Sequence, residues 1–393
     1  MSLKKIYYCH PLVFDFKSGV TSQVIRDSVH LARRGCEVFL FGTYSDEAAF
    51  DAIRNYIGDA SVRLMVKKGA DKRWRGWFFI LFMIRMMLDF TPGKTIIARQ
   101  YGKISQLLLL RPFLRKPFII LELHENAFPH LMPPKHGRSA MEIKNICRKV
   151  IERADGLSLT NHSQEVVLKA EFKKLPPYVV FPNGVEWKRF SKARPGQPDK
   201  GEFVVTYTGQ FTGWKNIELL FKALALLDER FTLRIAGGKG DEASRKLIED
   251  LTARHGLEGR VDYRGFVAPE SLVPEVIDGS SVLALPLGDN MESRWFTSPM
   301  KLFEYMATGI PVVAVDMPSV RLITGGDAVY LSENEPGSFA GAIMSAVTSP
   351  DREERVERMN AIGRRYTYEK RAAAIDAFLA GLRQDSVHTT DPF

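Results

Sequence analysis

The sequence of 393 residues contains only three cysteines, Cys9, Cys36 and Cys147, and none of them forms a C-x-x-C pair. This scarcity argues against a disulfide framework or a cysteine-based zinc site and favours a reducing compartment. No signal peptide is recognisable, because Lys4 and Lys5 lead directly into a short predicted strand. We therefore expect a cytoplasmic protein.

Familiar nucleotide and metal motifs are also missing. The chain opens with a strand, a loop, a helix and a second strand, but the loop lacks G-x-G-x-x-G, so a bound dinucleotide is not expected. A later glycine-rich loop, residues 209–216, has no Gly-Lys-Ser/Thr and is not a P-loop. No D-x-D occurs anywhere, so a metal-bridged diphosphate is not indicated. The sequence thus predicts neither a metal nor a resident cofactor, and it shows no repeat in the solenoid range.

The size and the charge distribution point to two domains of different character. A chain of 393 residues exceeds one ordinary core. Residues 1–190 hold 31 Lys and Arg against 17 Asp and Glu, whereas residues 191–393 hold 24 against 29. A basic first half indicates an anionic partner: a membrane surface, a phosphorylated substrate or nucleic acid. Without a recognised nucleic-acid module, nucleic acid ranks last.

The most informative stretch begins at Ser298 and reads S-P-M-K-L-F-E-Y-M-A-T-G-I-P-V-V. Ser298 is a good N-cap, and Pro299 is tolerated at the first helical position. The backbone N–H groups of Met300 and Lys301 then have no partner inside the helix and favour an anion. Glu304 lies one turn further on, within reach of whatever the anion is attached to. A nucleotide fits this arrangement, with its diphosphate on the N–H groups and its ribose on Glu304, although an ordinary capped helix explains the local pattern equally well.

This stretch resembles the donor-site motif of the retaining family 4 glycosyltransferases. The resemblance implies an α/β GT-B fold, with two Rossmann-like domains whose parallel sheets face a central cleft and a C-terminal helix that crosses back to the first domain. In that family the helix N-terminus binds the donor diphosphate, and the glutamate matching Glu304 binds the ribose. Many members carry another glutamate where this chain has Phe296. Its nearest substitutes lie in the preceding loop: Asp289, Asn290, Glu292 and Arg294.

Similar motifs in the same order extend the resemblance over most of the chain. Lys215 matches a lysine that neutralises the donor diphosphate, but Gln210 stands where an arginine is usual. Gly19 matches a turn near the donor phosphate, with a simple strand–helix connection as the alternative. The donor-binding residues that the resemblance implies are Gly19, Gly209, Lys215, Gly237, Gly238, Phe266, Val267, Ser298, Pro299, Met300, Lys301 and Glu304. The catalytic residues that it implies are His124, Lys215 and Glu304.

His124 also stands out by its position. It follows a predicted buried strand, residues 118–123, and ligands of open α/β sheets bind at the carboxyl ends of the strands. His-Glu is not the start of a zinc-protease motif, because Phe128 replaces the second histidine. The matching histidine of the family lies against the transferred sugar. On its own, a histidine at a strand end is more often structural.

The alternation of strands and helices predicts the domain boundaries. We expect a first domain at 1–190, onto which 367–383 packs back, a linker at 191–201, a second domain at 201–366 and a disordered tail at 384–393. Ser163 is expected to cap the helix that follows strand 156–160. The predicted strands are 5–10, 37–42, 95–99, 118–123, 156–160, 178–181, 203–208, 231–236, 261–264, 281–287, 310–315 and 328–331.

The most apolar segment runs from Trp74 to Phe90 and is too short and too charged to span a bilayer. It is apolar nearly all round, so it predicts either a buried helix or a helix at a membrane interface. Aromatic residues near its start, Trp74, Trp77 and Phe78, would suit insertion. The basic residues that precede or begin it are Lys67, Lys68, Lys72, Arg73 and Arg75.

The resulting hypothesis is a retaining, metal-independent hexosyltransferase that uses a nucleotide-diphosphate sugar as donor. The acceptor is expected to be a lipid-linked glycan or glycolipid in polysaccharide biosynthesis, at an anionic membrane surface on the inner face of the cytoplasmic membrane. Two alternatives stay open: an epimerase or phosphorylase on the same fold, and a non-catalytic scaffold that keeps nucleotide binding. Phe296 and Gln210 favour the scaffold.

Overall fold

The computed structural model describes residues 4–10, 12–16, 19–69, 72–91, 93–114, 117–124, 128–131, 139–196 and 201–383. The chain forms two compact units: Met1–Asn183 together with Tyr368–Phe393, and Gly184–Thr367. The predicted linker at 191–201 therefore falls inside the second unit. There the Arg194 N–H donates to the Asp278 carboxylate (3.0 Å) and the Gly196 N–H to the Ser280 carbonyl (2.8 Å). The tail at 384–393 lies outside the described residues.

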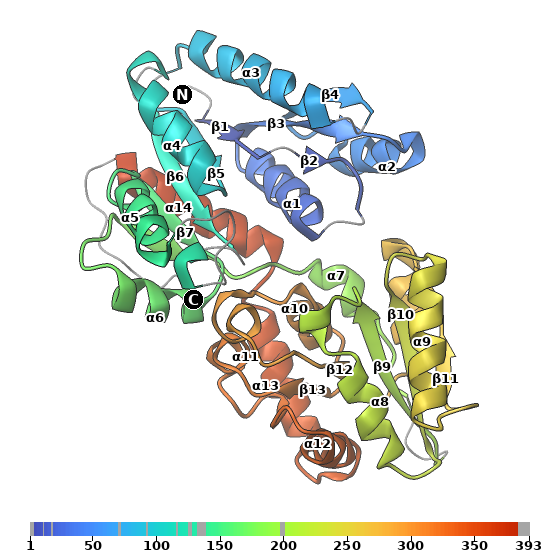
Figure 1. Ribbon diagram of the computed structural model, residues 1–393. Helices are drawn as coiled ribbons and strands as arrows, with labels where there is room; N and C mark the ends of the chain where they lie inside the picture. The colour runs from blue at the N-terminus through green and yellow to red at the C-terminus, as the bar shows by residue number, and fades with distance from the viewer. Residues whose placement is uncertain are drawn as a thin grey trace. The chain divides into compact units, whose positions relative to one another are not determined.

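The described part of the first unit contains an eight-stranded parallel sheet in the order β2-β3-β1-β5-β6-β7-β8, with β4 on the other side of β3 (Figure 1). Strands β5 and β7 are buried along their whole length, as expected for a parallel sheet with both faces covered. The strands are β1 (Lys4–Tyr8), β2 (Leu12–Val13), β3 (Cys36–Tyr44), β4 (Val62–Lys68), β5 (Thr95–Ala98), β6 (Phe118–Leu123), β7 (Gly156–Leu159) and β8 (Tyr178–Val180).

Helices connect most of these strands, as parallel pairing requires a long crossover between strands. The helices of the first unit are α1 (Gly19–Arg33), α2 (Glu47–Ile57), α3 (Lys72–Leu88), α4 (Tyr101–Leu110), α5 (Ala140–Ile151), α6 (His162–Glu171) and α14 (Tyr368–Arg383). Helix α5 begins with a complete capping box, in which Ser139 and Glu142 satisfy each other's backbone N–H groups. The prediction that Ser163 caps α6 is wrong: Asn161 is the N-cap, and its side chain accepts from the Ser163 N–H at 3.0 Å.

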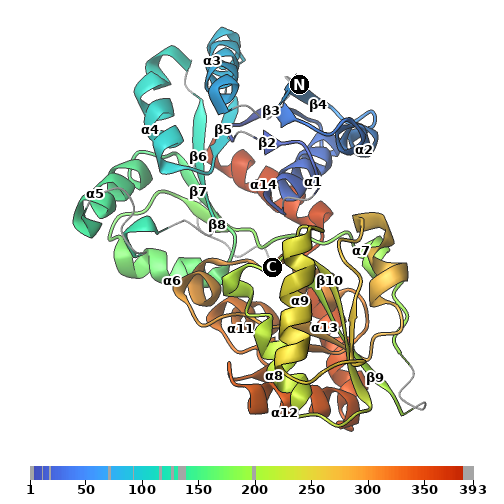
Figure 2. The same cartoon turned by 45° about the vertical axis from the view of Figure 1, so that its right-hand side comes forward.

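Helix α14 returns to the first unit and packs along α1, as Figure 2 shows. A buried ion pair joins the two helices, because Arg371 Nε donates to both carboxylate oxygens of Asp27 at 2.9 and 3.1 Å. Arg371 also donates to the carbonyls of Phe181 and Pro182, just after β8. Breaking one partner of such a pair leaves an uncompensated buried charge, so the contact fixes where the last helix lies.

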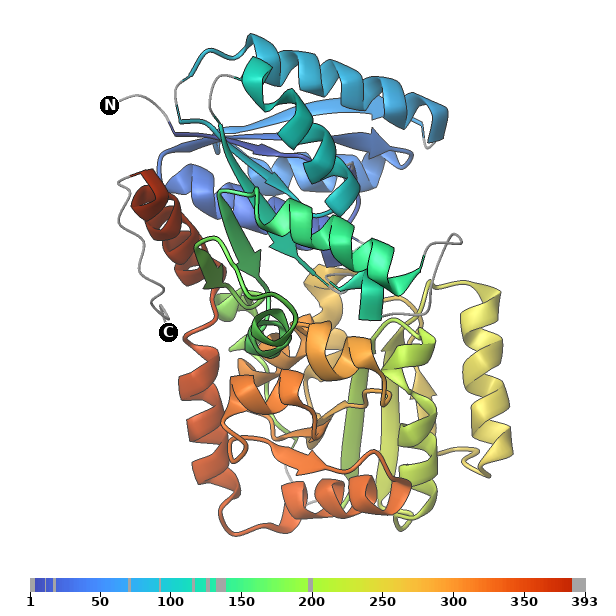
Figure 3. The ribbon, with the colours of Figure 1, turned by 60° about the vertical axis from the view of Figure 1, so that its left-hand side comes forward.

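The second unit contains a six-stranded parallel sheet in the order β11-β10-β9-β12-β13-β14 within its described residues. Figure 3 shows its helices alongside the strands, among them α9 in yellow. The strands are β9 (Phe203–Gly209), β10 (Phe231–Gly237), β11 (Val261–Tyr263), β12 (Val282–Leu285), β13 (Val312–Val315) and β14 (Tyr330–Ser332). The helices are α7 (Trp187–Phe190), α8 (Glu218–Ala225), α9 (Glu242–Arg254), α10 (Met300–Met306), α11 (Pro318–Thr324), α12 (Pro336–Thr348) and α13 (Arg352–Gly363).

The apolar segment at 74–90 forms helix α3, which covers one face of the first sheet (Figure 3). Phe82 and Met86 are fully buried, and the Phe82 ring lies 4.5 Å from that of Phe41 on β3. The outward side is apolar as well: Trp77 is 64% exposed and Leu81 is 51% exposed. One side of the helix is therefore buried against the sheet, and the other side is apolar and exposed. The side chains of 72–76 and 78, which include most of the predicted basic cluster, lie outside the described residues.

No helix among the described residues is both long and apolar enough to cross a membrane.

Candidate functional site

The order of strands in the second sheet marks a place for a ligand. From β9 the chain adds β10 and β11 on one side, and then β12, β13 and β14 on the other. Ligands of open parallel sheets bind beyond the carboxyl ends of the strands where this order reverses, here between β9 and β12. The loops after both strands are joined there, because the Gly288 N–H donates to the Trp214 carbonyl at 2.9 Å.

Glycines form the backbone at this edge. The Gly238 N–H donates to the Gly209 carbonyl (2.9 Å), and the Gly237 N–H donates to the Gly265 carbonyl (2.7 Å). Gly237 has φ 135°, and a Cβ on it would lie 1.8 Å from the Gly209 oxygen. Gly238, with φ 72°, has equally little room beside Ser244. Because side chains are excluded, a bound group can approach the main chain closely.

Helix α10 brings two predicted donor-binding side chains together. Lys301 Nζ donates to Glu304 Oε2 at 2.8 Å, and both side chains keep some exposure. The hydroxyl of Tyr305 accepts from the Thr208 N–H at 2.8 Å and so fastens the helix to the end of β9, next to Gly209. The sequence motif gave no sign of this tyrosine's role. A cation and a carboxylate are therefore held at the glycine-lined edge.

The start of α10 differs by one residue from the prediction. Pro299, not Ser298, occupies the N-cap position, with an extended backbone and no side-chain capping bond. The Leu302 N–H donates to the Pro299 carbonyl (2.9 Å), so the N–H groups of Met300 and Lys301 precede the first turn. The helix has only seven residues, so its dipole is small and Lys301 supplies most of the positive charge.

Lys215 lies in the short helical turn Gly213–Lys215 of the loop after β9. Its Nζ lies 3.6 Å from the centre of the Trp214 ring, a cation–π contact. The next residue, Asn216, has a left-handed backbone and donates to Asn334 at 2.9 Å. Lys215 therefore lies at the same edge as Gly209, on a loop that Trp214 joins to the loop after β12.

Phe266 and Val267 follow β11 at the far side of this edge. Phe266 is 39% exposed and packs against Gly240, where a Cβ would come within 2.9 Å of its own Cβ. An exposed aromatic ring beside a glycine turn can stack on a planar base.

In the loop that was predicted to replace the missing glutamate, most of the candidate side chains already have partners within the loop. Phe296 is fully buried at the end of the wide helical turn Glu292–Phe296. Asp289 and Arg294 form an exposed two-point ion pair, with Nη2 and Oδ2 2.7 Å apart. Asn290 accepts from the Ser293 N–H at 2.8 Å. Glu292 carries a carboxylate at the start of the turn and is the strongest of the four substitutes.

The first unit has its own reversal of strand order, between β1 and β5. Three polar side chains follow the carboxyl ends there: His10 after β1, Arg99 after β5 and His124 after β6. His124 donates through Nε2 to the buried Glu122 carboxylate, which also pairs with Arg99 Nη2 at 2.6 Å. The Tyr8 hydroxyl is 3.3 Å from the other oxygen of Glu122. Gly19, the remaining predicted residue of this unit, is the first residue of α1.

Burial and the Arg99 charge set the protonation of this cluster. Burial, and then Arg99, lower the pKa of His124 to about 4, against the opposing effect of Glu122. Burial raises the pKa of Glu122, but Arg99 and His124 outweigh it and hold the pKa well below its usual range. Burial and the charges of Arg99 and His124 lower the pKa of His10 to about 4 as well. His124 is therefore neutral and Glu122 ionised at neutral pH, and the glutamate orients the imidazole.

Arg99, Glu122 and Asp27 were not among the predicted site residues. The signal for Arg99 was the same as for His124, a polar residue directly after a buried strand. Glu122 interrupts the apolar strand 118–123, and a carboxylate inside a buried strand must have a partner. Asp27 and Arg371 are 344 residues apart, so no local pattern could have joined them.

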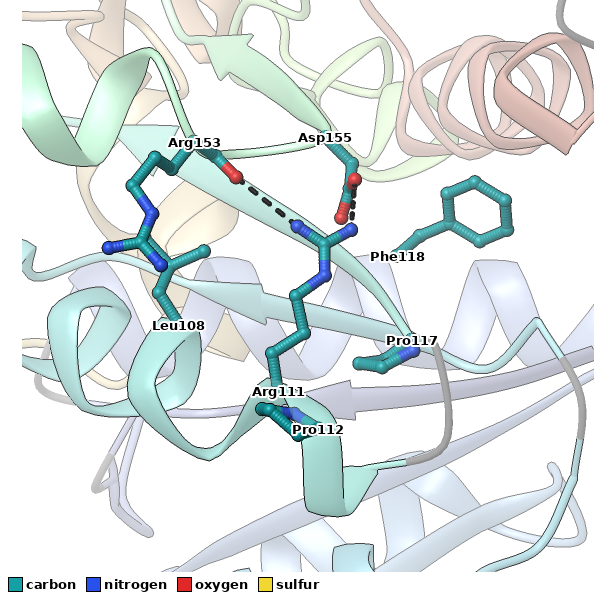
Figure 4. Close-up of a pocket in the computed structure, with 7 residues that line it drawn as sticks. All are labelled: Leu108, Arg111, Pro112, Pro117, Phe118, Arg153 and Asp155. Carbon is teal, nitrogen blue, oxygen red and sulfur yellow. Dashed lines mark hydrogen bonds and ion pairs between the residues drawn. The ribbon is translucent and has the colours of Figure 1, made fainter.

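A cavity of about 790 Å³ lies elsewhere in the first unit. Figure 4 shows Arg111 reaching across it between the Arg153 carbonyl (3.3 Å) and the Asp155 carboxylate. Phe118 on its wall is the first residue of β6, the end opposite to His124. The residues that line this cavity include none of the predicted site residues.

In the part of the chain that the structure describes, no three His, Cys, Asp or Glu side chains gather closely enough to hold a metal ion.

A segment of the second unit is similar to a known protein family. Residues 202–349, which lie wholly within it, match the family model described as Glycosyl transferases group 1. No curated protein matches the sequence. The matched segment contains Gly209, Lys215 and the Lys301–Glu304 pair.

Solved structures match the whole chain at low sequence identity. HepE from Anabaena, solved with UDP and glucose, is 16% identical with a TM-score of 0.71, over 96% of this chain and 100% of HepE. Sucrose-phosphate synthase from Thermosynechococcus elongatus is 18% identical with a TM-score of 0.75, over 98% and 100%. The lipopolysaccharide outer core galactosyltransferase WaaB is 17% identical with a TM-score of 0.66, over 96% and 99%. The predicted GT-B fold is confirmed, and the family match supports a glycosyltransferase.

Proposed function

We propose that this protein is a retaining glycosyltransferase whose second unit binds a nucleotide-diphosphate sugar. The observation that carries the proposal is the Lys301–Glu304 pair on α10. Tyr305 holds this helix to the glycine-lined end of β9, and both lie in the segment that matches the glycosyltransferase family. Lys301 would attract the diphosphate, and Glu304 would accept hydrogen bonds from the ribose hydroxyls. UDP is the first nucleotide to test, because HepE was solved with UDP and with UDP-glucose.

The chemistry follows from the charges at this edge. The diphosphate leaves with negative charge, and preorganised donors that stabilise this charge lower the barrier most. Lys215 and Lys301 are placed to do so, and for this reason we expect no metal requirement. In the first unit the neutral His124, held by Glu122, presents a hydrogen-bonding imidazole suited to a sugar hydroxyl.

A thermal-shift screen with UDP, GDP and ADP tests the donor site. A ligand at 100 times its Kd stabilises the bound protein by about 2.7 kcal/mol. We expect one of the three to raise the Tm and the Lys301→Ala variant to lose most of the shift. Equal indifference to all three nucleotides would reject the proposal. Incubating the enzyme with donor and excess EDTA then tests the expected metal independence, since sugar transfer should persist.

A nucleotide-binding scaffold without activity is the second candidate. Two observations favour it: Phe296, which is buried, stands where many family members have a glutamate, and Gln210 stands where an arginine is usual. The two candidates separate when the protein is incubated with its preferred nucleotide sugar. An enzyme releases nucleoside diphosphate, whereas a scaffold binds the donor and leaves it intact.

We further propose that the acceptor is a lipid-linked glycan or glycolipid at an anionic bilayer on the inner face of the membrane. The first unit carries 32 Lys and Arg against 20 Asp and Glu, and the second 23 against 26, although both are built on parallel sheets. The exposed side of α3 adds apolar side chains that could insert between lipids. The large exposed ones are Trp77, Ile80, Leu81, Ile84 and Leu88.

Sedimentation with vesicles tests this second proposal. Binding should require anionic lipid, fall at high salt and weaken in the Trp77→Ser/Leu81→Ser variant. Leu226→Ser is the matched control, because Leu226 is 62% exposed but lies in the second unit. Binding that is indifferent to lipid charge would reject the membrane surface and leave the donor proposal untouched.

A further inference from the structure

Arg99 is a buried cation that uses only part of its hydrogen-bonding capacity. Its side chain is only 4% exposed and its Nη2 pairs with Glu122 at 2.6 Å, yet Nε and Nη1 lack a hydrogen-bond partner among the described residues. A guanidinium carries five N–H donors in a rigid fork. Buried donors are nearly always satisfied, because leaving one unsatisfied is costly. The remaining donors of Arg99 suit a ligand that accepts hydrogen bonds.

Two further groups reach the same edge of the sheet from other elements. His10, after β1, has a buried Nδ1 without a hydrogen-bond partner among the described residues. Lys103, in the first turn of α4, lies with Nζ 3.7 Å from the centre of the Phe79 ring rather than on a carboxylate. Strands β1 and β5 are neighbours in the sheet, and the Cys9 N–H donates to the Ile97 carbonyl at 2.7 Å, so His10, Arg99 and Lys103 follow the same edge.

Among the described residues of this edge, positive charges outnumber negative ones. Glu122 offsets Arg99, His124 is neutral at physiological pH, and Lys103 adds a positive charge. Helix α4 also begins here, and the side chain of Gln100 at its N-cap makes no capping bond. Donors that converge from β1, β5 and α4 suit a tetrahedral anion better than a planar carboxylate, because its terminal oxygens point in several directions.

We propose that a phosphate ester of the acceptor binds at the edge formed by His10, Arg99 and Lys103. The inference rests on the proposed function, since it names the chemistry by which this glycosyltransferase would recognise its acceptor. The phosphate could belong to a lipid carrier or to a soluble sugar phosphate. Arg99 would supply a two-point contact, and Lys103 a point charge.

Histidine NMR of the full-length protein tests this site directly. An anion that binds beside His10 favours the protonated imidazole, so inorganic phosphate should raise the pKa of His10 from about 4 in a saturable manner. Arg99→Lys keeps a charge opposite Glu122 but removes the fork, and should weaken phosphate binding about tenfold, or about 1.4 kcal/mol. Lys103→Met should also weaken it without disturbing Glu122. Lys149→Met, on the exposed side of α5, is the matched control and should change nothing.

Two controls separate this site from the donor site. Lys301→Met should leave the His10 response to phosphate unchanged, and Arg99→Lys should leave the thermal shift with nucleotide unchanged. A nucleotide shift without a saturable His10 response, or equal phosphate affinity in Arg99→Lys and wild type, would overturn the inference while the proposed function stands. A hexose phosphate and a polyprenyl phosphate in bicelles then distinguish the source, since only the matching one should bind more tightly than inorganic phosphate.

Discussion

The two units are built on parallel sheets, but they present different chemistry at the carboxyl ends of their strands. The second unit presents backbone: Gly209, Gly237 and Gly265 are hydrogen-bonded across neighbouring strands, with a single lysine–glutamate pair nearby. The first unit presents buried charge, with Glu122 between Arg99 and His124.

The two sheets fix the geometry at the carboxyl ends of their strands in different ways. Glycines allow a ligand to reach main-chain N–H groups, and their positions are fixed by steric exclusion. Buried charges must be paired to be tolerated, and their positions are fixed by their partners. The second unit should therefore lose stability when a side chain is added at these glycines. The first unit should lose stability when one of its buried charges is removed.

Removing one buried charge should have the largest effect. Asp27→Ala leaves Arg371 uncompensated inside the first unit and should destabilise it by about 3–5 kcal/mol. Replacing both partners, as Asp27→Leu/Arg371→Met, should recover part of the loss, because no buried charge is then left alone. Urea unfolding measures both. A double variant less stable than Asp27→Ala would contradict the charge argument.

Adding one methyl group should damage the second edge almost as much. In Gly237→Ala the new Cβ meets the Gly209 carbonyl, and the backbone is held at φ 135°, so we expect a loss of about 1–3 kcal/mol from crowding and more from strain. Gly341→Ala is the control, because that glycine lies in α12 with open space around it, and it should be neutral or stabilising. Similar melting temperatures for the two variants would show that steric exclusion does not shape this edge.

Truncating the charged pair of α10 should affect binding more than folding. Lys301→Ala and Glu304→Ala should each weaken nucleoside diphosphate binding by about 1.5–3 kcal/mol, the usual loss for a hydrogen bond to a charged group. Lys222→Ala, which breaks a surface pair with Glu218 on α8, is the control. Calorimetry gives the affinities, and unchanged values in both α10 variants would remove this helix from the site.

Acid should weaken the first unit through its histidines. His10 and His124 have pKa values of about 4 in the folded protein, below the value of about 6.5 in an unfolded chain. Between these values the unfolded state binds more protons, so stability falls as pH drops from about 6.5 to about 4, by at most about 1.4 kcal/mol per pH unit for each histidine. Unfolding followed at several pH values should show a shallower slope in His10→Asn. An equal slope would contradict the burial of His10.

Much of this contrast was predictable from the sequence, because it rests on local patterns. Apolar runs followed by turn residues located the strands, and the S-P-M-K-L-F-E stretch located α10. Boundaries shifted where two residues compete for one role: Pro299 took the cap position from Ser298, and Asn161 from Ser163. The Pro- and Gly-rich composition of 191–201 did not reveal that the Arg194 N–H donates to the Asp278 carboxylate, which holds this segment to the second unit.

The buried ion pairs of the first unit could not be predicted from local sequence patterns. Asp27 meets Arg371, and Arg99 meets Glu122, only because the sheet and the returning helix bring distant segments together. The outward side of α3 was ambiguous for the opposite reason, since apolar residues on all sides of a helix do not say which side is covered.

A crystal structure with UDP bound would test the central claim most directly. The account predicts the diphosphate within hydrogen-bonding distance of Lys301 and the N–H groups that begin α10, the ribose hydroxyls on Glu304, and the base near Phe266. UDP bound away from the carboxyl ends of β9 and β10, with the Lys301–Glu304 pair untouched, would contradict it.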